Sequence, residues 1–131
     1  MSQSPSTTRR QHVRYVHASD GTRLAWAESG NGRDIVKAAN WLTHLEYEWE
    51  SPVWKHWLQF FSAHWRFVRY DERGCGMSGW QGGVLTVPQW AADLEMVIDA
   101  AQRCSRFGSR EQPQGIRCSR HCRRASVRCS R

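Results

Sequence analysis

Hydrophobic and polar positions alternate in two short segments near the start of the chain. Residues 13–17 and 22–28 show this alternation, and the Asp20-Gly21 dipeptide between them is typical of a hairpin turn. These segments therefore predict two antiparallel strands. The next apolar segment, residues 35–39, is short and mostly apolar, as in strands that are buried in parallel sheets.

Two later segments carry apolar residues at helical spacing, and residues 67–70 between them predict another strand. For the first helix, Ser51 is expected to be the N-cap and Pro52 the first-turn proline. For the second, Thr86 and Gln89 fit a capping box. The apolar positions are Trp54, Trp57, Leu58 and Phe61 in the first helix, and Trp90, Leu94, Val97, Ile98 and Ala101 in the second.

The order of these elements is hairpin, strand, helix, strand, helix. Strands that alternate with helices predict an α/β fold with three layers and a mainly parallel sheet, preceded here by an antiparallel hairpin. The expected organisation is a disordered leader at 1–12, one partial domain of four strands and two helices at 13–102, and a disordered tail at 103–131.

Charge and cysteine both separate the tail from the body. Residues 103–131 hold nine Arg and one Glu, whereas residues 1–102 hold ten Lys or Arg and eleven Asp or Glu. The net charge of +7 therefore belongs to the tail, through which non-specific nucleic-acid binding is possible. Five cysteines, without an export signal or a long apolar run, predict a cytoplasmic protein without a membrane segment.

Histidine and acidic residues suggest no metal or cofactor. His44, Glu46, Glu48 and Glu50 alternate with apolar residues, which favours a solvated loop edge over a metal site. The inward residues of that edge would be Leu45, Tyr47 and Trp49, while His56 and His64 are expected at a helix surface and a helix end.

The run from Arg69 to Trp80 reads RYDERGCGMSGW and carries the pattern D-x-R-G-x-G-x-S. It resembles the loop that follows the fourth strand of α/β-hydrolase domains. Residues 37–54 add to the resemblance, which covers residues 13–101 and points to a bacterial subgroup of these hydrolases, some fused to cyclase or transcription-regulator domains. The resemblance implies hydrolysis of an ester or similar small acyl substrate by a serine on a G-x-S-x-G elbow.

The resemblance also implies that catalytic parts are missing. The 131 residues contain no G-x-S-x-G, so the nucleophile, acid and histidine are expected to be absent. The carried-over oxyanion-hole donor is the backbone N–H of Trp41, next to Asn40. In the resembled fold the strand at 35–38 lies between the strand ending at Tyr70 and the nucleophile strand, so it should form an open edge here.

The loop itself has two interpretations. As a structural loop, Asp71 and Arg73 hold it together, Gly74 and Gly76 let it bend, and Ser78 is no nucleophile because no strand-to-helix elbow surrounds it. As a Rossmann-like nucleotide site, Gly74, Gly76 and Gly79 match G-x-G-x-x-G, but that motif should open directly into a helix. The nucleotide site is kept as an alternative.

The tail repeats Arg-Cys-Ser-Arg at 103–106, 117–120 and 128–131, without the paired cysteine spacings of a zinc site. Arg, Ser and Cys dominate when GC-rich codons for Ala, Leu and Gly are read one base off. A frameshifted or truncated gene is therefore the favoured explanation of the tail, and a genuine basic nucleic-acid-binding arm is the alternative.

Overall fold

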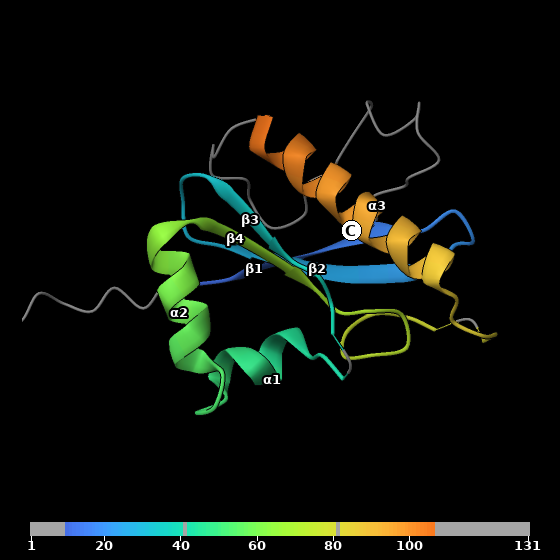
Figure 1. Cartoon of the computed structure of the whole chain (residues 1–131), viewed down its shortest axis with the longest axis horizontal. Helices are drawn as coiled ribbons and strands as arrows, with labels where there is room; N and C mark the ends of the chain where they lie inside the picture. The colour runs from blue at the N-terminus through green and yellow to red at the C-terminus, as the bar shows by residue number, and fades with distance from the viewer. Residues whose placement is uncertain (1–9, 41, 81, 107–131) are drawn as a thin grey trace, which may run out of the picture.

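The computed structural model describes residues 10–40, 42–80 and 82–106 (Figure 1). Three helices accompany four strands in the described ranges, one helix more than the sequence predicts. In chain order the elements are β1 His12–His17, β2 Arg23–Ser29, β3 Asp34–Lys37, α1 Leu45–Glu50, α2 Lys55–His64, β4 Arg66–Tyr70 and α3 Val87–Arg106.

The four strands form one mixed sheet in the order β1-β2-β4-β3. β1 and β2 pair antiparallel, β2 and β4 pair antiparallel, and β3 and β4 pair parallel. The expectation of a mainly parallel sheet is therefore wrong for the described strands. The hairpin and its junction with β4 supply two antiparallel pairings, and the helical crossover supplies the parallel one. β3 borders β4 and lies at the edge, as the resemblance implies.

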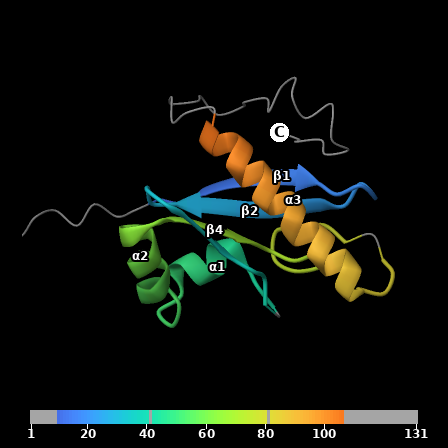
Figure 2. The same cartoon turned by 45° about the horizontal axis from the view of Figure 1, so that its top comes forward.

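Helices cover both faces of this sheet. α3 crosses one face, and α1 and α2 lie on the other (Figures 1 and 2). Alternate residues of β2 point to opposite layers: Leu24 and Trp26 belong to the core under α3, and Ala25 and Ala27 pack with Leu45 of α1. The core under α3 therefore receives the larger buried side chains of β2, each of which contributes about 1.5–3 kcal/mol through its burial.

Residues 45–50 form helix α1, so the predicted loop edge is wrong. His44 is the N-cap, and its Nδ1 accepts a hydrogen bond from the Tyr47 N–H at 3.3 Å. Leu45 is buried, whereas Tyr47 is 73% exposed and does not point inward. The acidic and apolar residues alternate along the sequence as they would in a strand. In the helix, however, Leu45 and Glu48 are three residues apart and therefore lie on the same side.

The predicted start of the next helix is also wrong. Ser51 is the C-cap of α1, with its backbone N–H donating to the Tyr47 carbonyl at 2.9 Å, and Pro52 lies in the turn before α2. α2 begins at Lys55 after Trp54, which makes no side-chain capping bond. Pro52 has no N–H and a fixed φ, so it suits this irregular turn as well as a helix start.

α3 is longer than the sequence pattern predicts. Thr86 Oγ1 accepts the Gln89 N–H at 3.3 Å, as expected at the start of this helix. The helix continues to Arg106, so residues 103–106 are helical where a tail was expected. Cys104 extends the apolar stripe and packs against the core, which explains the extension.

Two sets of predictions lie outside the described residues. The leader is described only from Arg10, and His12 already belongs to β1. Residues 107–131 are not described, so the frameshift and the nucleic-acid-binding arm stay predictions. Within the described ranges, no helix has the length and apolar character needed to cross a membrane.

Candidate functional site

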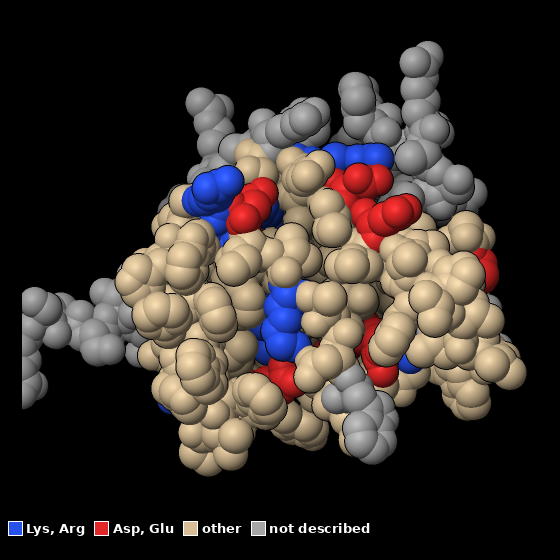
Figure 3. Space-filling view, in the orientation of Figure 1, with Lys and Arg blue, Asp and Glu red and all other residues tan. Residues whose placement is uncertain are grey.

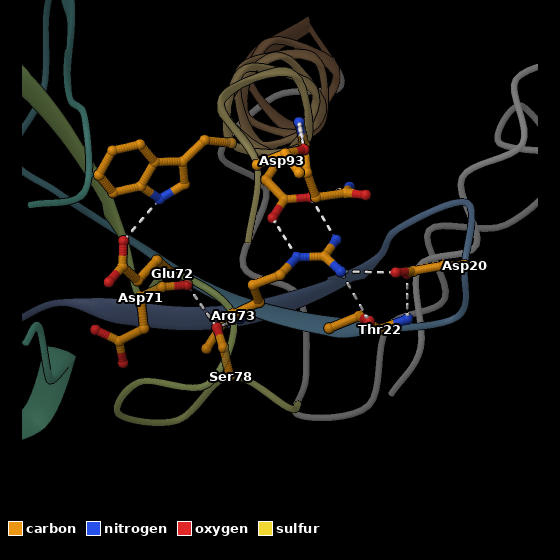
Figure 4. A network of polar contacts seen from close by, with 11 residues as sticks. Asp20, Thr22, Asp71, Glu72, Arg73, Ser78 and Asp93 are labelled. Carbon is orange, nitrogen blue, oxygen red and sulfur yellow. Dashed lines mark hydrogen bonds and ion pairs between the residues drawn. The ribbon is translucent and has the colours of Figure 1, made fainter. Parts of the chain in front are cut away.

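The loop at residues 71–80 follows β4, and the connection to α1, described at residues 38–40 and 42–44, follows β3. Because β3 and β4 are parallel, both connections leave the sheet at the carboxyl ends of these strands. Ligand sites of α/β sheets lie outside the carboxyl ends of parallel strands. A ligand site is therefore expected at the carboxyl ends of β3 and β4, and Figure 4 shows polar contacts of the loop after β4.

Asp71 joins the two connections. Its side chain is fully buried, and Oδ2 accepts the Leu45 N–H at 3.1 Å and the Met77 N–H at 2.8 Å. A carboxylate that accepts backbone N–H groups makes stronger hydrogen bonds than a neutral acceptor does. One side chain thus fixes the start of α1 against the loop after β4.

Gly76 leaves room for this carboxylate. Its φ is +50°, and a Cβ atom at this position would lie 2.2 Å from Asp71 Oδ2 and 2.8 Å from the Thr43 carbonyl oxygen. Any side chain would collide with both the carboxylate and the main chain of the neighbouring turn. The approach of the two connections therefore depends on glycine at this position.

Ser78 is bound to the main chain. Its hydroxyl donates to the Asp71 carbonyl at 2.6 Å and accepts the Ala25 N–H at 2.8 Å (Figure 4). Among the described residues its hydrogen-bond partners are thus backbone groups, and neither is a general base. A serine nucleophile needs a base that can take its proton. The geometry gives Ser78 a role in holding the loop to β2.

Arg73 connects the loop to α3 and to the hairpin turn. Its Nε and Nη2 atoms each lie 2.7 Å from an oxygen of Asp93, and Nη1 lies 2.6 Å from Asp20 Oδ2 (Figure 4). The hydrogen bond from Arg73 lowers the pKa of Asp20 to about 2. The hydrogen bond to Asp93 raises the pKa of Arg73 further above its usual value. Arg73 therefore links its loop to α3 and to the turn between β1 and β2.

Glu72 lies beside a cysteine in the same loop. It is 5% exposed, with Oε2 accepting the Trp90 Nε1–H at 2.7 Å and Oε1 accepting the Cys75 thiol at 3.4 Å. Burial, and then the Glu72 carboxylate, raise the pKa of the Cys75 thiol. The thiolate is the nucleophilic form of cysteine. This environment keeps Cys75 protonated at neutral pH.

The predicted oxyanion-hole residue, Trp41, lies outside the described residues. Its neighbour Asn40 is exposed, and the Asn40 side-chain oxygen accepts a hydrogen bond from Lys37 Nζ. Burial lowers the pKa of Lys37, while the carboxylate of Glu48 opposes that shift. The role of the Trp41 N–H stays a prediction.

The loop glycines are engaged within the fold. The Gly74 N–H donates to the Gly79 carbonyl at 3.0 Å, and the Gly79 N–H donates to the Arg23 carbonyl at 2.7 Å. α3 begins only at Val87. The G-x-G-x-x-G motif therefore does not open directly into a helix, and its context does not favour the nucleotide-binding alternative.

The acidic residues around His44 are placed apart from one another. Glu48 pairs with Arg69 at 2.7 Å, whereas Glu46 and Glu50 are exposed. In the described ranges no group of three His, Cys, Asp or Glu side chains is arranged to hold a metal ion. His56 is exposed on α2, and His64 Nδ1 lies 2.9 Å from the Phe60 carbonyl at the end of that helix.

Two shallow hollows lie beside the connection that follows β3. One, of about 250 Å³, is mostly apolar and lies between the end of β3 and the first half of α3; the other, of about 290 Å³, lies beside α1. On the face in Figure 3, charged side chains of the described residues form small separate groups on a largely uncharged surface. The first hollow is lined by Ala38, Ala39, Tyr70, Val87, Trp90, Ala91 and Leu94, and the second by Leu42, His44, Tyr47, Glu48, Ser51 and Trp54.

Sequence reasoning missed three members of this site: Glu72, Trp90 as its partner, and Asp93. The signal for Asp93 was an acidic residue on the apolar side of α3, one turn before Val97. A buried acid on such a stripe requires a partner, because an unpaired buried charge is strongly disfavoured. Its partner, Arg73, lies in a motif that the sequence analysis had already singled out.

Comparison with known proteins finds a distant relative. No family model matches the chain. Over 84 residues, 64% of the chain, it is 30% identical to a non-heme haloperoxidase of Rhodococcus erythropolis. The matched part covers 29% of that protein, so the chain spans less than a third of its length. This similarity supports a distant relationship to the α/β-hydrolases, the family of that haloperoxidase.

Proposed function

We propose that the chain is the N-terminal part of an α/β-hydrolase-type domain whose chemistry is hydrolysis of an ester or similar acyl substrate by a serine nucleophile. The observation that carries the proposal is the parallel pair β3–β4, whose two following connections are joined by the Asp71 carboxylate. The weak similarity to a haloperoxidase supports the same class of chemistry.

The described residues would serve this chemistry as a scaffold. A tetrahedral intermediate is stabilised by backbone N–H groups that are held in place before the reaction. The connection between β3 and α1 would carry one such donor. Asp71 anchors the residue after that connection, Leu45, through a hydrogen bond of 3.1 Å. Asp71 and Gly76 would thus act by positioning and would not touch the substrate.

The nucleophile would have to come from residues that this sequence does not contain. No G-x-S-x-G occurs in the 131 residues, and the hydroxyl of Ser78 is held between two backbone groups. We therefore propose that the chain by itself does not hydrolyse esters.

An esterase assay tests this proposal. Purified chain is expected to release p-nitrophenol from p-nitrophenyl acetate and butyrate at the rate of buffer, and to give no mass shift with a fluorophosphonate probe. A known serine hydrolase serves as the positive control for both reagents. Ser78→Ala is the matched variant. Turnover or labelling that disappears in Ser78→Ala would show that this chain carries a nucleophile and would refute the proposal.

A further inference from the structure

Leu42 has a backbone conformation that residues with a side chain normally avoid. Its φ is +58°, and within the described ranges no other residue besides glycine has a positive φ. The Cβ atom disfavours this left-handed region, so a leucine stays there only when its surroundings hold it. Leu42 is 69% exposed and lines the hollow beside α1, so burial of its own side chain does little to hold the backbone. Contacts of the main chain must therefore do so.

The main chain around Leu42 lies against the loop that follows β4. A Cβ atom on Gly76 would lie 2.8 Å from the Thr43 carbonyl oxygen, so these two residues are in close contact. Burial is the main effect on the pKa of Cys75 and raises it, but a hydrogen bond from the Leu42 backbone N–H to the sulfur acts in the opposite direction. Two neighbouring residues of the loop therefore contact two neighbouring residues of the connection before α1.

The Cys75 thiol is held from the other side by Glu72. Its Sγ lies 3.4 Å from Glu72 Oε1, and the Cys75 N–H donates to the Glu72 carbonyl at 3.0 Å. Glu72 is 5% exposed, and its other carboxylate oxygen accepts the Nε1–H of Trp90 on α3. A thiol can donate one hydrogen bond and accept another. Cys75 can therefore donate to Glu72 while its sulfur accepts the Leu42 N–H.

We propose that Cys75 is a positioning residue that holds Leu42 in its left-handed conformation. Through this thiol, α3, the loop at residues 71–80 and the connection before α1 are joined in one chain of contacts. The proposal rests on the proposed function, in which that connection carries an oxyanion-hole donor, and adds that Cys75 fixes the path of the main chain beside it. Cys75 itself would not touch the substrate.

The variant Cys75→Ala tests this role. Without the sulfur, Leu42 should leave the left-handed region. The strong NMR cross-peak between its own amide and α hydrogens, which a positive φ brings close together, should then weaken. Exchange of the Leu42 amide should become roughly 2- to 10-fold faster, as expected for the loss of one hydrogen bond. Cys75→Ser is the matched control, because a hydroxyl also donates and accepts and should restore both the cross-peak and the slow exchange.

A second pair of variants separates this role from a general loss of packing. Leu42→Gly removes the cost of the positive φ, because glycine adopts this conformation readily. Cys75→Ala should therefore lower the thermal midpoint less when Leu42→Gly is also present, as coupled positions do in a double-mutant cycle. Equal losses with and without Leu42→Gly, or an unchanged Leu42 cross-peak in Cys75→Ala, would overturn the proposal.

A measurement on the unaltered chain covers the case in which Cys75→Ala does not fold. Leu42 should show the strong cross-peak between its amide and α hydrogens, and a weak one would overturn the proposal. All these measurements report on the main chain and not on ester hydrolysis. The esterase assay and the Leu42 cross-peak can therefore fail separately, which distinguishes a failure of this proposal from a failure of the proposed function.

Discussion

Replacing Gly30 with alanine is expected to remove a large part of the stability of the fold. Gly30 has a φ of +76°, and an added Cβ would lie 2.2 Å from the Ser62 carbonyl oxygen and 2.3 Å from that of Trp65. Both contacts are with main-chain atoms at the end of α2, so no side-chain rotation can relieve them. The strained φ costs about 1–3 kcal/mol, and overpacking adds about 1–3 kcal/mol.

The combined loss is comparable with the lower end of the ~5–15 kcal/mol that stabilises a whole domain. Urea unfolding followed by tryptophan fluorescence measures it. Gly82→Ala is the control, because Gly82 has a similar φ of +80° with nothing described within 4 Å of the added Cβ. The difference between the two variants isolates the contact with α2. Equal losses would mean that Gly30 does not pack against the end of that helix as described.

Asp93→Ala is expected to destabilise the fold by about 3 kcal/mol, within the range for breaking a buried ion pair. The Asp93 side chain is 1% exposed and accepts hydrogen bonds from both Nε and Nη2 of Arg73, whose side chain is 11% exposed. Without Asp93, Arg73 keeps its bonds to the partly exposed Asp20 and to the Thr22 hydroxyl but loses its partner on α3. The same urea titration measures the change in the free energy of unfolding.

Asp99→Ala is the matched control on the same helix, because Asp99 is exposed. Substitutions at such surface positions usually change stability by less than about 0.5 kcal/mol. A variant that replaces both Arg73 and Asp93 with leucine should recover much of the loss, since it removes the uncompensated charge. If Asp93→Ala and Asp99→Ala unfold at the same urea concentration, Asp93 does not hold α3 to the loop.

The strands and the long helix could be predicted because their signals are local. Alternation gave β1 and β2, and apolar spacing gave α3, whose buried Val97 and Ala101 lie on the predicted side. α1 could not be predicted in this way, because a helix of six residues is too short to show its period. It is stabilised from a distance, by the burial of Leu45 and by the ion pair of Glu48 with Arg69 of β4.

The candidate site was predictable only as far as its motif extended. Asp71, Gly76 and Ser78 stand in the D-x-R-G-x-G-x-S pattern, and the structure places all three in the connection between β4 and α3. Trp90 and Asp93, which bind Glu72 and Arg73, lie on α3, 18 and 20 residues away. No spacing rule joins a loop to a helix over such distances, so these contacts follow from the tertiary fold alone.

The proposed function depends on β3 being the parallel neighbour of β4 and an open edge. The Arg66 N–H donates to the Arg33 carbonyl at 3.0 Å. Because successive residues of a strand face opposite neighbours, the amides of Ile35 and Lys37 then face β4, and those of Asp34 and Val36 face away from it.

Amide hydrogen exchange along β3, measured by NMR on the dilute chain, tests this arrangement most directly. Slow exchange is expected at Ile35 and Lys37, and fast exchange at Asp34 and Val36. Fast exchange at Ile35 would mean that the parallel pair with β4 does not form. Equally slow exchange at Val36 and Ile35 would mean that another strand covers β3, and either result would contradict an open-edged β3 paired in parallel with β4.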